Sequence, residues 1–351
     1  MVCRADINES FYENQKPNTP VMNQIIPALL IVLMLLFSSC KKDETVVGDQ
    51  SDNPTQPEWQ LFNTANSALP DNQVNAIGVS RDNTKWIGTA NGLVRIAGKS
   101  WTIFNTGNSL LPSSFIQAVA IQPDGTVWVG TNNGLAKFDG NNWSVYNSSN
   151  SVMPENAVMS LAFDPNFKRT WIGTSKGLVM VDNDNKWHFF DDTAGDLLHS
   201  LATDQNGNLW LGVFNHFQFQ GRIRKFDMQH WVTYKLNDYG YASTFVYSLA
   251  VNKNNEVIAL LTGTSVSCVV RVAGAALEEI PRSINATGIR TLLLDDTKMW
   301  AAGNGFSMLG NATMPVIKIP GEDHSILSIA KDSANSIWLG TLGGGLAIYK
   351  N

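Results

Sequence analysis

A short motif of Trp, an aliphatic residue and Gly recurs along this chain at a nearly constant interval. Its first three copies are Trp86-Ile87-Gly88, Trp128-Val129-Gly130 and Trp171-Ile172-Gly173, so successive Trp residues are 42 and 43 positions apart. This period matches the length of a propeller blade of four short strands. The repeat therefore restricts the chain to an architecture whose units bury their apolar faces against one another.

Seven copies can be aligned through a pair of apolar residues that precedes the motif with the spacing Val-x-x-Ile. The first members of these pairs are Val74, Ile116, Val158, Leu198, Val246, Ile289 and Ile326. Copies five and six are degenerate, since they read Ile258-Ala259-Leu260 and Trp300-Ala301-Ala302 in place of the motif. In the first copy, alternating apolar residues predict strands over 74–79, 85–89, 92–96 and 101–105. The sequence thus predicts an all-β fold over residues 58–351, a seven-bladed β-propeller of four-stranded antiparallel blades.

The seventh copy reaches the C-terminus after only three strands. The missing fourth strand has a counterpart at the other end, because residues 59–63 (WQLFN) match residues 101–105 (WTIFN) of the first copy. We expect this N-terminal strand to complete the last blade and close the ring, which removes two open sheet edges.

The first 57 residues indicate export. Residues 25–37 form an apolar run that is shorter than the roughly 20 residues of a membrane-spanning helix and typical of a signal-peptide core. The residues that follow, Phe37-Ser38-Ser39-Cys40, resemble the lipobox of bacterial lipoproteins, which implies lipidation of Cys40 and removal of a signal peptide over 1–39. Met22 is an alternative start.

Residues 40–57 are expected to be a flexible tether, and Lys41-Lys42-Asp43-Glu44 is similar to the short signal that sends Bacteroidetes lipoproteins to the outer surface. The expected location is the outer membrane, at the cell surface or in the periplasm.

Composition excludes several classes of partner and site. The net charge is −5 and there is no long basic run, so we expect no nucleic-acid partner, and membrane contact through the lipid anchor only. Three cysteines cannot form a disulfide framework or a four-cysteine zinc site. Cys268, left after lipidation of Cys40, is predicted to be a buried, inert thiol.

Two motifs of the repeat resemble those of the two-component regulator propeller family. They are Trp86-Ile87-Gly88-Thr89-x-x-Gly92-Leu93 and Phe62-Asn63-Thr64-x-Asn66-Ser67-x-Leu69-Pro70. Such repeats form the periplasmic sensor regions of hybrid kinases, where they detect carbohydrate fragments, and they also occur in free-standing lipoproteins. Because this chain has no kinase segment, the resemblance implies recognition of a ligand without a signalling output.

Comparison between copies identifies positions that are free for function. The second residue of each innermost strand varies, and ring symmetry places all seven near one mouth of the central channel: Asn75, Gln117, Met159, His199, Tyr247, Arg290 and Leu327. We single out His199, Tyr247 and Arg290 as ligand-binding candidates. The alternative is a solvated channel wall without a ligand.

The fourth copy carries an aromatic insertion. Phe214, His216, Phe217 and Phe219 replace a short turn, and the connection to the fifth copy adds Tyr239 and Tyr241. Aromatic rings beside polar groups suit a sugar or a protein partner. The alternative is a lid that buries its own aromatic rings.

An enzyme remains an alternative, because streptogramin lyases are seven-bladed propellers with a related repeat that use a histidine base, an acidic group and a divalent metal. No histidine here lies in a His-x-Glu or His-x-His pair, although His199 and His324, with Glu322 or Asp323, could meet at the channel mouth. We expect no catalytic residues and no cofactor, with Ca²⁺ or Mg²⁺ an option in turns such as Asp182-Asn183-Asp184. The sequence thus favours a non-catalytic lipoprotein that binds a glycan or a protein. A metal-assisted lyase and a structural scaffold of an outer-membrane complex are the alternatives.

Overall fold

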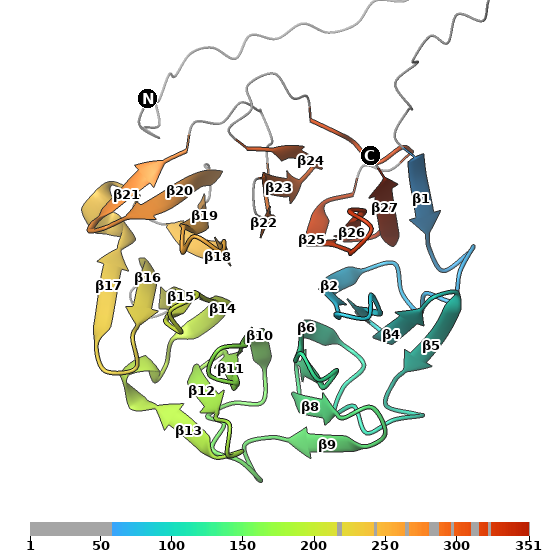
Figure 1. Cartoon of the computed structure of the whole chain (residues 1–351), viewed down its shortest axis with the longest axis horizontal. Helices are drawn as coiled ribbons and strands as arrows, with labels where there is room; N and C mark the ends of the chain where they lie inside the picture. The colour runs from blue at the N-terminus through green and yellow to red at the C-terminus, as the bar shows by residue number, and fades with distance from the viewer. Residues whose placement is uncertain are drawn as a thin grey trace, which may run out of the picture. The chain divides into compact units, whose positions relative to one another are not determined.

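The computed structural model describes residues 58–350, apart from 216–219, 242–243, 264–266, 281–287, 296–297, 310–315 and 322–323. In this part, seven antiparallel sheets stand around a central axis, and each sheet follows the previous one along the chain (Figure 1). The predicted seven-bladed propeller is confirmed. The predicted signal peptide, Cys40 and tether lie outside the described residues. No helix in the described ranges is long and apolar enough to cross a membrane.

The strands of the regular blades follow the repeat. Blade 1 comprises β2 (Val74–Val79), β3 (Lys85–Thr89), β4 (Gly92–Ala97) and β5 (Ser100–Phe104), within one residue of the predicted bounds. Blade 2 comprises β6 (Ile116–Ile121), β7 (Val127–Thr131), β8 (Gly134–Phe138) and β9 (Trp143–Tyr146), and blade 3 comprises β10 (Val158–Asp164), β11 (Arg169–Thr174), β12 (Gly177–Val181) and β13 (Trp187–Phe190).

Blades 4 and 5 have longer strands and are joined by a short 3-10 helix. Blade 4 follows η1 (Asp191–Thr193) and comprises β14 (Leu197–Thr203), β15 (Leu209–Asn215), β16 (Gln220–Phe226) and β17 (Trp231–Lys235). After η2 (Leu236–Tyr239), blade 5 comprises β18 (Thr244–Val251), β19 (Val257–Gly263), β20 (Ser267–Ala273) and β21 (Ala276–Glu279).

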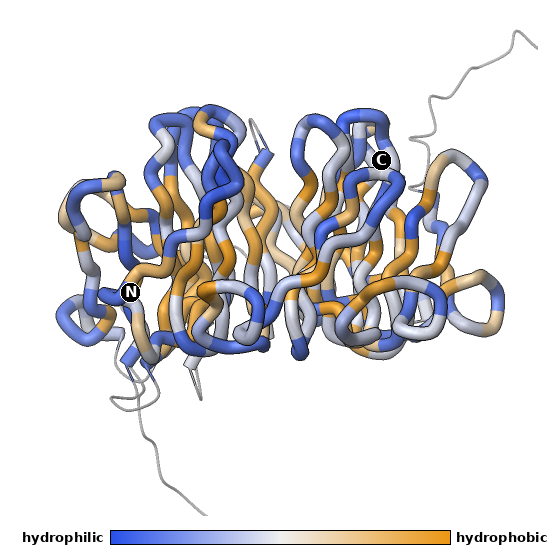
Figure 2. The backbone as a smooth tube through the Cα atoms, turned by 90° about the horizontal axis from the view of Figure 1, so that it is seen from below, coloured by the Kyte–Doolittle hydropathy of each residue, from blue (hydrophilic) through white to orange (hydrophobic). Residues whose placement is uncertain are grey.

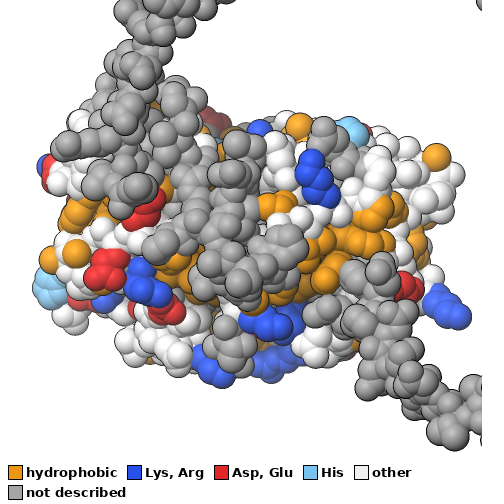
Figure 3. Space-filling view, turned by 90° about the horizontal axis from the view of Figure 1, so that it is seen from above, with side chains coloured by type: hydrophobic (Ala, Val, Ile, Leu, Met, Phe, Trp, Pro, Cys, Tyr) orange, Lys and Arg blue, Asp and Glu red, His pale blue; other side chains and the backbone are white. Residues whose placement is uncertain are grey.

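Blade 6 is the smallest sheet. Its described strands are β22 (Thr291–Leu294), β23 (Met299–Gly303) and β24 (Gly305–Met308). A single bridge between Phe306 and Ile317 occupies the place of the fourth strand. Pro320 follows shortly after and has no N–H to extend that pairing. In a space-filling view of this side of the ring, the visible hydrophobic side chains gather at mid-height (Figure 3).

The last blade joins the two ends of the propeller. It comprises β25 (Ile326–Lys331), β26 (Ile337–Thr341), β27 (Leu346–Lys350) and the N-terminal strand β1 (Glu58–Phe62). β1 pairs antiparallel with β27 from Glu58 opposite Lys350 to Phe62 opposite Leu346. The Trp59 ring lies edge-on to Tyr349 in the same blade and to Phe306 in blade 6. The predicted closure is confirmed.

A glycine in the second strand packs against the inner strand of the neighbouring blade. A Cβ atom built at Gly88 would lie 2.6 Å from Ile116, and one at Gly130 would lie 2.6 Å from Val158. Gly173, Gly212 and Gly340 meet Leu198, Val246 and Val74 in the same way, and the last of these pairs joins blade 7 to blade 1. The sequence suggested that these glycines admit a neighbouring backbone; the atoms closest to them are mainly side-chain atoms of the next inner strand. Hydrophobic residues thus run along the strands, with hydrophilic loops at both faces (Figure 2).

The inner strands share a β-bulge next to this contact. Pairing with the second strand shifts between Val74 and Ala76 in blade 1, and between the corresponding residues of blades 2, 3, 4, 5 and 7. The residue after each packed aliphatic side chain is therefore left out of the ladder. Bulges of this kind re-aim a side chain and are frequent beside functional sites.

A buried ion pair links blades 7 and 1. The Lys85 ammonium lies 3.2 Å from the Asp332 carboxylate, which also accepts a 3.0 Å hydrogen bond from the Trp338 indole N–H. Burial raises the pKa of Asp332, but hydrogen bonds from Trp338, Lys85 and the Ser336 N–H outweigh it and leave the pKa below its ordinary value of 3.8.

The glycine contact gives a first prediction. Gly130→Ala should destabilise the fold by about 1–3 kcal/mol, because its methyl group would overlap Val158. In a urea-unfolding cycle with Val158→Ala, the double variant should lose less stability than the sum of the single variants, by about 0.5–3 kcal/mol. Additive losses would contradict direct packing.

The ion pair between Asp332 and Lys85 gives a second prediction. Because the folded-state pKa of Asp332 is lowered, the stabilisation from this carboxylate is present above the unfolded-state pKa and is lost as pH falls through the folded-state value. We expect Asp332→Asn to lower the urea-unfolding free energy at neutral pH by about 1–3 kcal/mol and to flatten its decline towards acid pH. Asp124→Asn, in an exposed turn of blade 2, is the control and should leave the pH dependence nearly unchanged. Equal pH profiles for Asp332→Asn and the unmodified protein would refute this role.

Candidate functional site

Six of the seven variable positions of the inner strands occupy the bulges. These six are the residues left out of the ladder, and Arg290 precedes β22, with its N–H bonded to the Ala302 carbonyl. All seven side chains are half-buried. Since each bulge lies at the start of an inner strand, these residues line one end of the central axis (Figure 1). The structure therefore brings together the set that the repeat comparison selected.

One side of this ring is aromatic and basic. The rings of His199 and Tyr247 are stacked, with centroids 6.0 Å apart and planes inclined by 13°. The Arg290 guanidinium lies 3.5 Å from the Tyr247 hydroxyl, at the limit of a hydrogen bond. Phe245 lies 6.0 Å from His199 and 5.6 Å from Phe214. We call these five residues of blades 4, 5 and 6 the aromatic crescent.

The other side of the ring serves the fold. The Asn75 amide donates a 2.8 Å hydrogen bond to the Ile116 carbonyl of the next blade. The Gln117 amide contacts the Met159 sulfur at 3.8 Å. These contacts link neighbouring inner strands, so the ring is asymmetric, with its aromatic side chains in blades 4–6.

Phe245 was not among the residues that the sequence indicated for binding. It lies two positions before Tyr247 on β18, and side chains two apart in a strand share a face. Strand alternation was thus the signal that could have identified it. Phe214, which the sequence did indicate, reaches the crescent through Phe245.

The remaining aromatic candidates divide into two groups. His216, Phe217 and Phe219 lie outside the described residues. Tyr239, at the end of η2 on the rim of the ring, donates a 2.7 Å hydrogen bond to the Ala275 carbonyl of blade 5, and its ring packs on Tyr234. Tyr241 lies between this rim and β18, with its carbonyl bonded to the Thr244 hydroxyl. Tyr239 is therefore not part of the aromatic crescent.

A cluster of arginines secures the base of the blade 4 insertion. Arg222 and Arg224 of β16 both lie against the buried Asp196 carboxylate, at 2.9 and 3.5 Å. Burial lowers the pKa of Arg224, whose guanidinium also lies 4.0 Å from the Trp231 ring centroid. No motif indicated this cluster, which joins the strand after the insertion to the connection before β14.

Two histidine–carboxylate contacts lie at the outer edge of blades 3 and 4. His188 contacts Asp182 at 2.8 Å, and this hydrogen bond lowers the pKa of Asp182. His230 lies 3.5 Å from Asp227. Glu322 and Asp323 lie outside the described ranges, which contain no cluster of three or more metal-ligating side chains. Cys268 is buried in β20, as predicted.

Comparisons with known proteins agree with the repeat. The family model for the two component regulator propeller matches residues 110–133, which span β6 and β7. The chain carries a two component regulator propeller repeat. No curated protein matches the sequence.

Several solved structures share this fold. The extracellular domain of a hybrid two component system of B. thetaiotaomicron is 17% identical, with a TM-score of 0.67, over 84% of this chain and 42% of that one. A catalytically inactive virginiamycin B lyase of Staphylococcus aureus, solved with quinupristin, is 14% identical, with a TM-score of 0.68, over 84% and 100%. PorZ, a surface component of the type-IX secretion system of Porphyromonas gingivalis, is 16% identical, with a TM-score of 0.61, over 81% and 48%. At these identities the likeness establishes the shared fold, and the chain spans about two fifths of the sensor's length.

Proposed function

We propose that this protein is a lipid-anchored binding protein of the outer membrane, exposed at the cell surface or to the periplasm, that captures a glycan at the aromatic crescent. The observation that carries the proposal is the grouping of four aromatic rings and one arginine from three adjacent blades, with His199 and Tyr247 at β-bulges. Aromatic faces pack against the apolar faces of sugar rings, while the polar groups of His199, Tyr247 and Arg290 can bond sugar hydroxyls.

The proposal is binding without catalysis. A general base requires an orienting partner within hydrogen-bond reach, and the His188–Asp182 and His230–Asp227 contacts lie at the outer edge of blades 3 and 4, away from the crescent. The His199 ring packs beside the rings of Phe245 and Tyr247. A ring held in this way is suited to contact a ligand face.

The crescent gives a prediction for binding. In a thermal-unfolding screen against a panel of oligosaccharides, with and without calcium or magnesium, one sugar class at 100 times its Kd should stabilise the protein by about 2.7 kcal/mol. Tyr247→Ala/Arg290→Ala should abolish the shift, because it removes a stacking face and a donor.

Tyr239→Phe is the matched control, since it alters an aromatic residue at the rim and should retain the shift. Loss of the shift in the control with retention in the crescent variant would move the site to the rim. If no sugar shifts the unfolding temperature, glycan capture is wrong, and partners should be sought by pull-down from the outer membrane.

The anchor rests on the lipobox-like residues and gives a separate prediction. Full-length protein expressed in a Bacteroidetes host should incorporate a labelled fatty acid and remain in the membrane fraction until detergent is added. Cys40→Ser should be unlabelled and absent from that fraction, whereas Cys268→Ser, which alters the buried thiol, should behave as the unmodified protein. Labelling that persists in Cys40→Ser would contradict the anchor.

A further inference from the structure

The face opposite the crescent contains a groove across blades 1, 2 and 3. The bulges lie at the starts of the inner strands, and the turns after these strands, such as residues 80–84 and 122–126, lie at their other ends, about 16 Å away by the strand rise. Cavities of about 320 and 490 Å³ open between blades 1 and 2 and between blades 2 and 3. Arg81, Gln122, Pro123 and Asp124 line both, so the two cavities form one turn-side groove.

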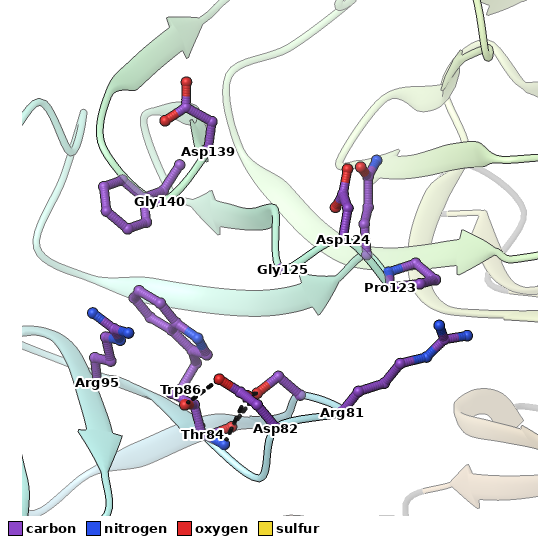
Figure 4. Close-up of a pocket in the computed structure, with 13 residues that line it drawn as sticks. Arg81, Asp82, Thr84, Trp86, Arg95, Pro123, Asp124, Gly125, Asp139 and Gly140 are labelled. Atoms are coloured by element: carbon purple, nitrogen blue, oxygen red, sulfur yellow. Dashed lines mark hydrogen bonds between the residues drawn. The ribbon is translucent and has the colours of Figure 1, made fainter.

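Three cations of this groove have no anionic partner within the described residues. Arg81, Arg95 and Lys168 line it, and none of them forms an ion pair or a side-chain hydrogen bond there. Lys137 lines it too, but its charge helps to lower the pKa of Asp139 and its ammonium lies 5.1 Å from the Trp128 ring centroid. The Nε atom of Arg95 is buried without a hydrogen-bond partner, and its guanidinium lies 5.8 Å from the Trp86 ring centroid. Figure 4 shows Arg81 and Arg95 of blade 1 across the cavity from Asp124 and Asp139 of blade 2.

The carboxylates of the groove are already satisfied by their own turns. Asp82 accepts hydrogen bonds from Ser80 and Thr84, and the bond from Ser80 is the main reason for its lowered pKa. Asp139 accepts from the Asn142 and Asn141 N–H groups, which lower its pKa. These acids are bound to their turns and form no ion pair with Arg81 or Arg95, which remain available to a ligand.

The other lining groups indicate which anion fits. Gln122 and the exposed Asn183 and Asn185 present amides, and Asp124 presents a carboxylate oxygen that can accept from a hydroxyl. A densely charged ligand, such as an acidic peptide or a polyphosphate, would meet these carboxylates and be repelled. A ligand polymer with many hydroxyl groups and few carboxylates matches the alternation of cations, amides and hydrogen-bond acceptors along the groove.

From these observations we infer that the turn-side groove is a second binding site, for a carboxylated polysaccharide, with Arg81 and Arg95 each bound to a different uronate carboxylate and the amides to neighbouring hydroxyls. Arginine is suited to this role because its planar fork binds a carboxylate through two parallel hydrogen bonds. This site is independent of the proposed glycan site at the crescent, since the two share no residue.

The test uses calorimetric titration of the protein with an oligogalacturonate and with its methyl ester. The free acid should bind, the ester should bind at least tenfold more weakly, and affinity for the acid should fall as salt rises. Arg81→Gln/Arg95→Gln should weaken binding of the acid at least tenfold. Arg271→Gln is the matched control, because Arg271 is paired with Glu256 in blade 5 and the change removes a positive charge elsewhere.

The crescent variant Tyr247→Ala/Arg290→Ala separates the two proposals, since it should bind the acid as the unmodified protein does. Lys168→Gln, in an exposed turn, provides a second groove variant should the arginine pair unfold the protein. Equal affinity for acid and ester, equal weakening by Arg271→Gln, or binding of tetraglutamate as strong as that of the acidic sugar would each overturn this assignment.

Discussion

The propeller depends on one contact, repeated at five of its seven blade junctions, in which an aliphatic side chain at the start of an inner strand packs against the backbone of a glycine in the preceding blade. A side chain at that glycine would overlap its neighbour, as the 2.6 Å approaches at Gly88 and Gly130 show. Because the same contact joins Gly340 of blade 7 to Val74 of blade 1, it also determines how the ring closes. In the degenerate copies the larger residues Leu260 and Ala302 stand in place of the glycine, and they belong to the hydrophobic clusters of blades 5 to 7.

The contact also determines where functional side chains can lie. The bulge residue follows directly after the packed aliphatic residue. The bulge residue can vary between blades, whereas the aliphatic residue beside it is required for packing. This separation lets blades 1 and 2 use their bulge residues for inter-blade bonds while blades 4, 5 and 6 gather aromatic rings. The two faces then differ in character. One presents stacked rings beside an arginine, and the other presents unpaired cations among capped carboxylates.

Much of the fold was predictable because its physical causes are local and repeated. Alternating apolar residues and Asn-Gly turns located the strands of blade 1 within one residue, and the match between residues 59–63 and 101–105 identified the closing strand. The seven positions at this mouth could be chosen from the alignment alone, because ring symmetry brings equivalent residues of successive copies close together in space. Blade 6 was predicted less well, because the bridge at Ile317 replaces a strand that the repeat pattern implied.

By itself, the sequence determined the number of blades, the closure of the ring and the residues that face one mouth, because each depends on a repeated short-range pattern. Only the tertiary structure decided which of those residues act together. Phe245 joins His199 and Phe214 because two blades pack side by side, whereas Tyr239 bonds to Ala275 at the rim. The turn-side groove likewise arises between blades, from turns about 40 residues apart in the chain whose cations and carboxylates meet only when the glycine contacts bring the blades together.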